Sequence, residues 1–417
     1  MVKIKSNFYD SLPVCRVGIV GTGFIASGLL KSLDRTPEFN VTKMLTRRDL
    51  HNISDHPRSE ILTDDVDELI DSCDLVVECS GNVIHATAVI DKLLAHDMPV
   101  VTLDAEFHVT TGSYFVGKGN LTEAEGDQPG SLAALHENVV GMGFRPIVYG
   151  NVKAYLNHNP TVEDMVFWAN RNGISLEQVT AFTDGTKVQI EQVLVANGLG
   201  ANIATTGLLG PHSETITEGA MILAKFAQNS SGVISDYIVS RDWSGGVFIV
   251  AEHDPEQVDY LRYYKMGDGP AYLIPQSYHL CHLEVPKTMR RVMNCGKKLL
   301  DNSAIPQFSV ATIAKRLLLP GELIPRGMGS FAVRGEAVRI DEHPNHLPIG
   351  LLFNGVIRNP VEPGQVLTFD DIDLPESLAI DAWNVIRRRS LPETPLEGNR
   401  ANGADLSMTK VNSFMPL

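Results

Sequence analysis

The sequence CRVGIVGTGFIASGLLKSLDR, residues 15–35, decides the fold. Its apolar start, CRVGIV, predicts a buried strand, GTGFIA follows as a G-x-G-x-x-A motif, and GLLKSLDR has a helical pattern. In such a unit the first glycine permits a tight turn, the second lets a pyrophosphate approach the backbone, and the small third residue lets the helix pack closely. The alternative is a glycine-rich turn without a ligand. We expect the motif to bind a dinucleotide through Gly21, Gly23, Phe24 and Ile25.

Strands and helices alternate through the N-terminal part of the chain. The runs VTKMLT, DLVVEC and PVVTLD read as strands, and HATAVIDKLLAHD between the last two reads as a helix. This alternation predicts a parallel sheet with right-handed crossovers, that is, an α/β fold of the doubly wound Rossmann type. We assign residues 1–156 to a nucleotide-binding domain.

The end of the second strand selects the cofactor. An NAD site would place Asp or Glu there to bind the ribose hydroxyls, whereas this chain has Arg47 and Arg48. Two guanidinium groups suit a 2′-phosphate, so we expect NADP(H); a solvated basic turn is the alternative. The turn after Glu78 borders the nicotinamide ribose in this topology, and Asn82 there is alternatively a helix cap. The expected contacts in this turn are Ser80, Gly81, Asn82 and His85.

Composition and charge narrow the class of protein. The 417 residues suggest two or three domains. With 50 acidic and 35 basic residues, the net charge of −15 disfavours nucleic acid and anionic membranes as partners. The five cysteines are dispersed and form no disulfide framework. Because the chain has neither a signal-peptide pattern nor a run of about 18 apolar residues, we expect a soluble cytoplasmic protein.

The remainder of the chain divides into three parts. Residues 157–304 mix helical and strand patterns and are expected to form an α+β catalytic domain. From about residue 305, short β runs are separated by Gly, Pro and Asp, which predicts a small all-β module over residues 305–390. Residues 391–417 lack periodicity and are expected to form a flexible tail.

The segment FTDGTKVQIE, residues 182–191, carries the catalytic candidates Asp184, Lys187 and Glu191. On a helix that starts after Gly185, Lys187 and Glu191 are four residues apart and share a face. A lysine at a helix start near an apolar wall can carry a proton or hold an alkoxide. The alternative is an exposed ion pair.

The segment SRDWSGG, residues 240–246, combines hydroxyl groups, glycine amides and a guanidinium, which together can cradle a phosphate. A β-turn with a structural arginine is the alternative. His279 and His282 are three apart, a spacing also found in metal sites, but no third or fourth ligand is evident, so the metal requirement stays open. The substrate-binding candidates are Ser240, Arg241, Ser244, Lys265 and His279.

Several of these segments together resemble one family. GTGFIA, GKGN with GDQPG, NPT, FTDGTK-x-Q-x-E, GGVF, YYKMGDGP and YHLCHLE are similar to the homoserine-dehydrogenase-like oxidoreductases with a C-terminal SAF domain, over about residues 15–385. The resemblance implies a Rossmann domain, a catalytic domain and a small β-clip module. It also makes Lys187 the leading catalytic candidate and Arg241 and Ser244 phosphate ligands. The chain departs from the family pattern at Trp243 and at residues 106–108.

One branch of the family contains enzymes similar to 1-deoxy-D-xylulose-5-phosphate reductoisomerase, which form 2-C-methyl-D-erythritol 4-phosphate with NADPH. The expected function is therefore that of an NADPH-dependent oxidoreductase that acts on a small phosphorylated keto-sugar and forms homo-oligomers; a requirement for a divalent metal is left open. A dehydrogenase of homoserine or of another polyol phosphate is the first alternative. A non-enzymatic, carbohydrate-binding role of the β module is the second.

Overall fold

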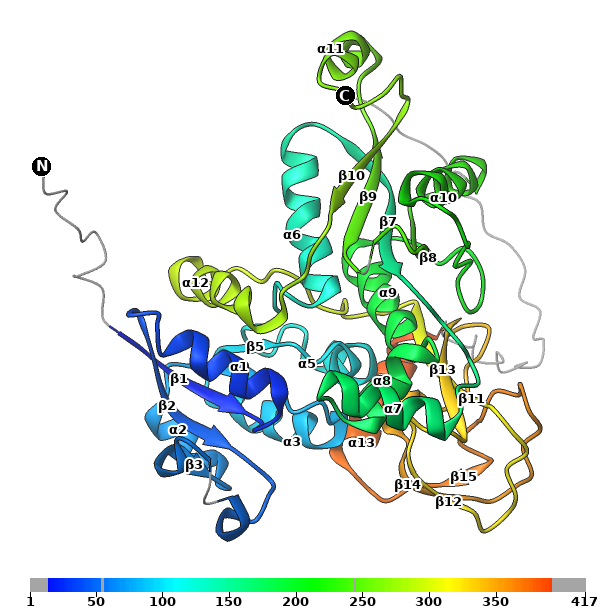
Figure 1. The fold of residues 1–417 in the computed structure, drawn as a ribbon. Coiled ribbons are helices and arrows are strands. Elements are labelled where there is room, and N and C mark those ends of the chain that lie inside the picture. Colours follow the sequence, from blue (N-terminus) through cyan, green and yellow to red (C-terminus); the bar gives the residue numbers. More distant parts are fainter. Residues whose placement is uncertain (1–13, 54–55, 231, 244, 392–417) are drawn as a thin grey trace, which may run out of the picture.

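The computed structural model describes residues 14–53, 56–230, 232–243 and 245–391, without the side chains of residues 51, 52 and 295. Ser244 and all of the expected tail except Leu391 lie outside the described residues. Figure 1 shows a parallel sheet with its helices, a second sheet that extends into a long hairpin, and a β-rich C-terminal module beside both. Among the described residues, every helix is too short or too polar to span a membrane.

The N-terminal sheet is parallel, in the order β3-β2-β1-β4-β5-β6, which confirms the Rossmann-type prediction. The strand order reverses between β1 and β4, and ligands of such sheets bind in the crevice outside the carboxyl ends of the strands. Helix α1 packs on one face, and α2 and α3 pack on the other. The strands are β1 (Cys15–Val20), β2 (Phe39–Leu45), β3 (Leu62–Thr63), β4 (Leu75–Glu78), β5 (Val100–Thr102) and β6 (Leu121–Glu123). The helices are α1 (Phe24–Leu33), η1 (Leu50–Ile53), η2 (Ser59–Ile61), α2 (Val66–Ser72), α3 (Val83–Leu94), α4 (Ala105–Phe107), the π-helix η3 (His108–Gly112) and α5 (Ser113–Phe115).

The second sheet has the order β10-β9-β7-β8. Strand β7 pairs parallel to β8 and antiparallel to β9, and α6 packs against this sheet. Helix α6 and strand β7, which precede the predicted domain boundary at residue 156, therefore belong to the core of the second sheet. The strands are β7 (Arg145–Lys153), β8 (Ile234–Val239), β9 (Val247–Glu252) and β10 (Ala271–Gln276). The helices are α6 (Gln128–Gly141), α7 (Val162–Asn172), α8 (Leu176–Thr183), α9 (Thr186–Leu199), α10 (Ile216–Ser230), η4 (Pro255–Gln257), α11 (Val258–Tyr263), η5 (Cys281–Leu283) and α12 (Val285–Cys295).

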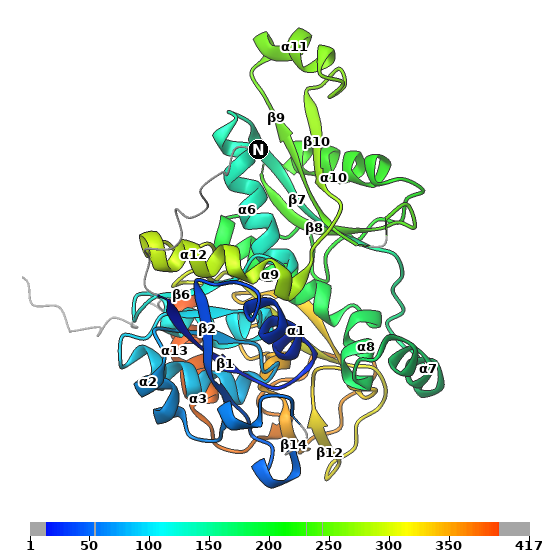
Figure 2. The same ribbon diagram turned by 60° about the vertical axis from the view of Figure 1, so that its left-hand side comes forward.

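Helix α12 returns to the N-terminal sheet after the long hairpin. Its buried residues Val285, Met289 and Val292 join the core formed by β1 and α1. Figure 2 shows α12 beside that sheet and α11 at the opposite tip of the hairpin. The segment that follows the second sheet thus packs back onto the N-terminal sheet, and the two sheets are connected through α12.

Helix α9 is buried on all sides along most of its length. The amide N–H of Gly335, on strand β13 (Val333–Arg339), donates to Thr186 Oγ1 at 2.8 Å, and the N–H of Ala337 donates to Gln189 Oε1 at 2.9 Å. On another side, Gln192 Nε2 donates to backbone carbonyls of β7 and β8. The helix that carries the catalytic candidates is therefore held by the second sheet and by the C-terminal module together.

The C-terminal module consists of β11 (Phe308–Ala314), β12 (Leu323–Arg326), β13 (Val333–Arg339), η6 (Ile349–Leu351), β14 (Phe353–Ile357), β15 (Ile372–Asp373) and α13 (Leu378–Ser390). The prediction of an all-β module is wrong at its end, where α13 forms. The Ser377 side chain caps this helix by accepting from the Ile380 N–H, and Ala379, Trp383 and Ile386 bury a helical stripe. Helix α13 lies against α3 of the N-terminal part.

Candidate active site

The turn after β1 is shaped for an anion. Gly21 has φ +116°, and a Cβ there would lie 3.1 Å from the Cys79 carbonyl oxygen. Gly23 is the N-cap of α1 and provides no side-chain cap, and a Cβ at Gly23 would meet no protein atom within 4 Å. The N–H groups of the first turn of α1 therefore face open space, as a pyrophosphate site requires.

A cavity of about 190 Å³ opens beside this turn. Nine of the ten residues expected to contact the cofactor line it. The tenth, Asn82, caps α3 instead, because its Oδ1 accepts from the His85 N–H at 2.9 Å. The lining residues are Gly21, Thr22, Gly23, Phe24, Ile25, Leu45, Thr46, Arg47, Arg48, Cys79, Ser80, Gly81, His85 and Gln178.

The charge at the end of β2 suits a phosphate. Partial burial, followed by repulsion from Arg326, lowers the pKa of Arg47, which still remains protonated at neutral pH. Burial lowers the pKa of His85 to about 4, so the neighbouring imidazole is neutral. Within the described chain the Arg47 guanidinium makes no ion pair. The cavity thus offers two arginines that form no ion pair with any described residue, at the place where the ribose of a dinucleotide is expected, and its residues fit NADP(H).

Carboxylates gather where the parallel strands end, beyond the nucleotide turn. Glu78 ends β4; its Oε1 accepts from the Ser80 N–H at 2.8 Å and its Oε2 accepts from Thr102 Oγ1 at 2.9 Å. Glu123 ends β6, and Asp104 follows β5. All three are buried. The sheet topology therefore places acidic groups from three strands at one edge.

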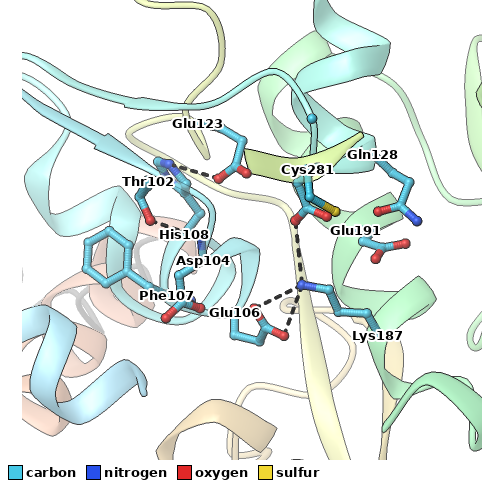
Figure 3. A network of polar contacts seen from close by, with 12 residues as sticks. Thr102, Asp104, Glu106, Phe107, His108, Glu123, Gln128, Lys187, Glu191 and Cys281 are labelled. Carbon is cyan, nitrogen blue, oxygen red and sulfur yellow. Dashed lines mark hydrogen bonds and ion pairs between the residues drawn. The ribbon is translucent and has the colours of Figure 1, made fainter. Parts of the chain in front are cut away.

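Lys187, at the start of α9, reaches into this acidic edge (Figure 3). Its Nζ lies 3.1 and 3.2 Å from the two carboxylate oxygens of Glu106 and 3.5 Å from Asp127 Oδ2. Burial opposes the charge, but Asp127 and Glu106 raise the pKa of Lys187 well above its ordinary value. Its side chain is 12% exposed, which excludes the exposed ion pair. Lys187 is an enclosed ammonium group.

The surrounding carboxyl groups differ in protonation. Lys187 is the main stabilising charge that lowers the pKa of Glu106 against its burial. Burial, followed by the charges of Glu78 and Glu106, raises the pKa of Asp104 well above its ordinary value. Burial, followed by the charge of Asp127, also raises the pKa of Glu123 well above its ordinary value. The cluster therefore combines Glu106, whose lowered pKa favours the carboxylate, with Asp104 and Glu123, whose raised pKa favours the protonated form, and such a combination suits proton transfer.

A second arm of the cluster runs from Glu191 to His279. Glu191 shares the helix face of Lys187 but accepts from Lys153 Nζ at 3.0 Å and from Asn151 Nδ2 at 2.7 Å. With its amide oriented to satisfy its neighbours, Gln128 donates to Glu191 and accepts from Lys153 and His279. Gln128 also donates to Asp127, a partner of Lys187, so His279 joins the same polar network as Lys187. Figure 3 shows Gln128 and Glu191 next to each other near that lysine.

Two residues that the sequence predicted for the active site lie outside the Lys187 network. Asp184 is completely buried and pairs with Lys315 of the C-terminal module at 2.6 Å, while its other oxygen accepts from the Thr186 N–H. Asp184 thus lies in an ion pair with the C-terminal module rather than in the Lys187 network, and its catalytic role stays a prediction. Lys265 is exposed just after α11, at the hairpin tip that Figures 1 and 2 place away from α9, and the structure does not bring it to Lys187.

The expected phosphate segment is only partly arranged for a ligand. The Ser240 hydroxyl is buried, donates to the Glu214 carbonyl and accepts from the Asp242 N–H, so it is already engaged. Arg241 is exposed. A Cβ at Gly245 would lie 3.6 Å from the His279 ring, so this end of the segment borders the Lys187 network.

The residues missing from the sequence prediction are those that the topology assembles: Glu78, Asp104, Glu106, Glu123, Asp127, Gln128 and Lys153. The signal for Glu78, Asp104 and Glu106 was available, because each lies at the end of a predicted strand or follows one within a few residues; Glu123 ends β6, a strand that was not predicted. Within the part of the chain that the structure describes, no group of three or more His, Cys, Asp or Glu is arranged to hold a metal ion.

Two family models match the chain. Residues 21–111 match the NAD binding domain of homoserine dehydrogenase, and residues 126–285 match the catalytic domain of oxidoreductase DRL. No curated protein matches the chain significantly.

Similar solved structures include dehydrogenases. A probable dehydrogenase from Thermotoga maritima has 13% identity and a TM-score of 0.38, and the match covers 68% of this chain and 90% of the dehydrogenase. UDP-N-acetylglucosamine 3-dehydrogenase from Acidithiobacillus ferrooxidans has 10% identity, a TM-score of 0.41 and coverages of 70% and 93%. A myo-inositol dehydrogenase from Corynebacterium glutamicum has 12% identity and a TM-score of 0.41, and the match covers 68% of this chain and 90% of the dehydrogenase.

The two family matches fall on the two parts of the chain that form the site. The first covers the nucleotide turn and the second covers Lys187 and His279. The chain is an NAD(P)-dependent oxidoreductase with a nicotinamide cofactor.

Proposed function

We propose that the chain is an NADPH-dependent oxidoreductase of a small phosphorylated keto-sugar, with 1-deoxy-D-xylulose 5-phosphate as the first substrate to test. The observation that carries the proposal is Lys187, an enclosed ammonium at the carboxyl edge of a nucleotide-binding sheet, with Glu106 at 3.1 Å. An ammonium in such a place meets the negative charge that develops on a carbonyl oxygen during reduction.

The cofactor would be held by the N–H groups at the start of α1, by Arg47 and Arg48, and by the turn after β4. When bound, the nicotinamide supplies the hydride. Lys187 Nζ donates to the substrate carbonyl oxygen and passes it a proton as the alcohol forms. Asp104, held neutral beside Glu106, is the group placed to return a proton towards Lys187. This chain therefore supplies both polarisation and the proton.

The many acceptors around Lys187 favour a polyhydroxylated substrate. Glu106, Asp127 and Glu191 offer carboxylate oxygens to hydroxyl groups on the same side of α9. Arg241 is exposed on the segment that leads to Gly245 and His279, where a guanidinium can bind a phosphate remote from the carbonyl. A phosphorylated sugar satisfies both features. An isomerising step before the reduction is part of the proposal for this substrate.

A substrate panel tests the proposal. The purified full chain is incubated with NADPH and 1-deoxy-D-xylulose 5-phosphate, its unphosphorylated analogue, or aspartate semialdehyde, and NADPH loss is followed by absorbance. We expect turnover of the phosphorylated sugar. Arg241→Ala should raise KM for it about tenfold or more and remove the preference over the analogue. Arg145→Ala is the control, since Arg145 is exposed and pairs with Glu252 instead. Turnover of aspartate semialdehyde alone would overturn the substrate class and favour the homoserine-type alternative.

A further inference from the structure

The C-terminal module reaches the nucleotide cavity through the end of β12. Arg326, the last residue of that strand, has its Nη1 3.9 Å from Glu177 Oε1 on α8. The loop that follows packs tightly there, because a Cβ at Gly329 would lie 2.1 Å from the Glu177 carbonyl oxygen. Gln178, the next residue on α8, lines the cavity together with Arg47. Arg326 therefore stands at the rim of the nucleotide cavity.

Arg326 lies near enough to Arg47 for the two positive charges to repel, and the carboxylate of Glu78 only partly offsets this repulsion at Arg47. Their repulsion contributes to the lowered pKa of Arg47. Among the described residues Arg47 has no ion pair, and the single carboxylate near Arg326 is beyond hydrogen-bond distance. A chain with a net charge of −15 thus brings like charges together from segments almost 280 residues apart. Such convergence is unfavourable unless an anion lies between the groups.

We propose that Arg326 binds the same phosphate as Arg47 and Arg48, the 2′-phosphate of NADPH, so that the C-terminal module completes the cofactor site. The inference rests on the proposed NADPH preference and adds a third specificity-determining arginine to it. A phosphate dianion accepts several charge-assisted hydrogen bonds at once, and guanidinium groups donate them in pairs.

The C-terminal module packs directly against the N-terminal part of the chain, which holds the nucleotide cavity. Helix α13 packs on α3, and a Cβ at Gly350 would lie 2.2 Å from Thr110 Oγ1, so the two parts are in close contact. Glu177 holds Arg326 at the rim and also competes with a phosphate for it. Removing the Glu177 charge should therefore strengthen binding of a 2′-phosphate, the opposite of the effect expected for Arg326.

The test measures binding without substrate, so that a substrate phosphate cannot contribute. Dissociation constants of the full chain for 2′,5′-ADP, NADPH and NADH are measured by calorimetry for wild type, Arg326→Met, Glu177→Gln and the control Arg316→Met. Arg316 belongs to the same module but pairs with Glu322. We expect Arg326→Met to weaken 2′,5′-ADP and NADPH about tenfold and to leave NADH unchanged. Glu177→Gln should tighten 2′,5′-ADP, and Arg316→Met should change nothing.

The outcomes separate this inference from the proposed function. If wild type prefers NADPH and the preference disappears in Arg47→Ala/Arg48→Ala but survives in Arg326→Met, the inference is overturned and the NADPH preference stands. If wild type binds NADPH and NADH equally, the preference itself fails, and the role of Arg326 fails with it. Equal weakening of NADPH and NADH by Arg326→Met would also overturn it. Melting temperatures of each variant check the fold.

Discussion

Replacement of Lys187 by Met removes the ammonium while keeping most of the side-chain volume. With an effective dielectric constant of about 20, each of its contacts, at 3.1 Å to Glu106 and 3.5 Å to Asp127, has a gross Coulomb energy of ~5 kcal/mol, much of it offset by desolvation. Because an uncompensated buried charge is costly, Glu106 should take up a proton in the variant. The polarising charge and the proton donor are then both lost. We expect kcat to fall by about 10² to 10⁴.

The assay is single-turnover oxidation of bound NADPH with the substrate found in the panel, which reports hydride transfer without product release. NADPH affinity, measured separately by fluorescence, should barely change. Lys187→Arg keeps the positive charge with a different geometry and should fall between wild type and Lys187→Met.

Lys315→Met is the matched control. Lys315 forms a comparable buried ion pair, 2.6 Å from Asp184, but outside the Lys187 network. Breaking it should cost about 3–5 kcal/mol of folding free energy and leave the kcat of the folded fraction unchanged. If Lys187→Met stays folded and keeps kcat within about threefold of wild type, Lys187 does not act on the substrate. If Lys315→Met lowers kcat as much as Lys187→Met does, the effect is one of packing.

Three further predictions concern the cofactor site and stability. Gly23→Ala should lower the melting temperature only slightly, because its Cβ meets no protein atom within 4 Å although alanine is a poorer N-cap than glycine. It should nevertheless weaken NADPH binding about tenfold or more by intruding on the pyrophosphate, as measured by fluorescence titration. Arg47→Ala/Arg48→Ala should remove most of the preference for NADPH over NADH; a retained preference would place the 2′-phosphate elsewhere. Burial lowers the pKa of His346 to about 4, so its stabilising contribution, complete above about pH 6.5, should be lost as the pH falls towards 4, by at most about 1.4 kcal/mol per pH unit. When the free energy of unfolding is measured in urea across that pH range, its slope against pH should be flatter for His346→Gln than for wild type. Substitution of the exposed residue in His96→Gln serves as the control and should not flatten it. Equal slopes for wild type and His346→Gln would contradict the prediction.

The nucleotide half of the site could be predicted because its information is local. GTGFIA, the two arginines after β2 and the turn after β4 each follow a strand directly, and a parallel sheet brings such turns together by rule. The assignment at Asn82 shows the limit: a cap and a cofactor contact have the same sequence pattern, and only the position of its side chain separates them.

The catalytic half depends on contacts between distant segments, which spacing does not encode. Asp184 and Lys187 lie three residues apart, yet Asp184 pairs with a lysine 131 residues away while Lys187 pairs with Glu106, 81 residues earlier. Lys265 lies away from Lys187 because the length of the β9–β10 hairpin, which spacing in the sequence does not reveal, sets its position. The SAF assignment of the module, homo-oligomerisation, cytoplasmic location and a divalent metal requirement stay predictions.

The burial of α9 between the second sheet and β13 has a consequence for how the chain is made. Thr186 and Gln189 receive their partners from Gly335 and Ala337, almost 150 residues later in synthesis. The nucleotide-binding strands can pair while the chain is still emerging from the ribosome, but the helix bearing Lys187 has no complete surroundings until β13 has been synthesised. A nascent chain stopped before residue 333 should therefore be able to pair its nucleotide-binding strands while lacking turnover, and synthesis of the C-terminal module should be the last step in forming the active site.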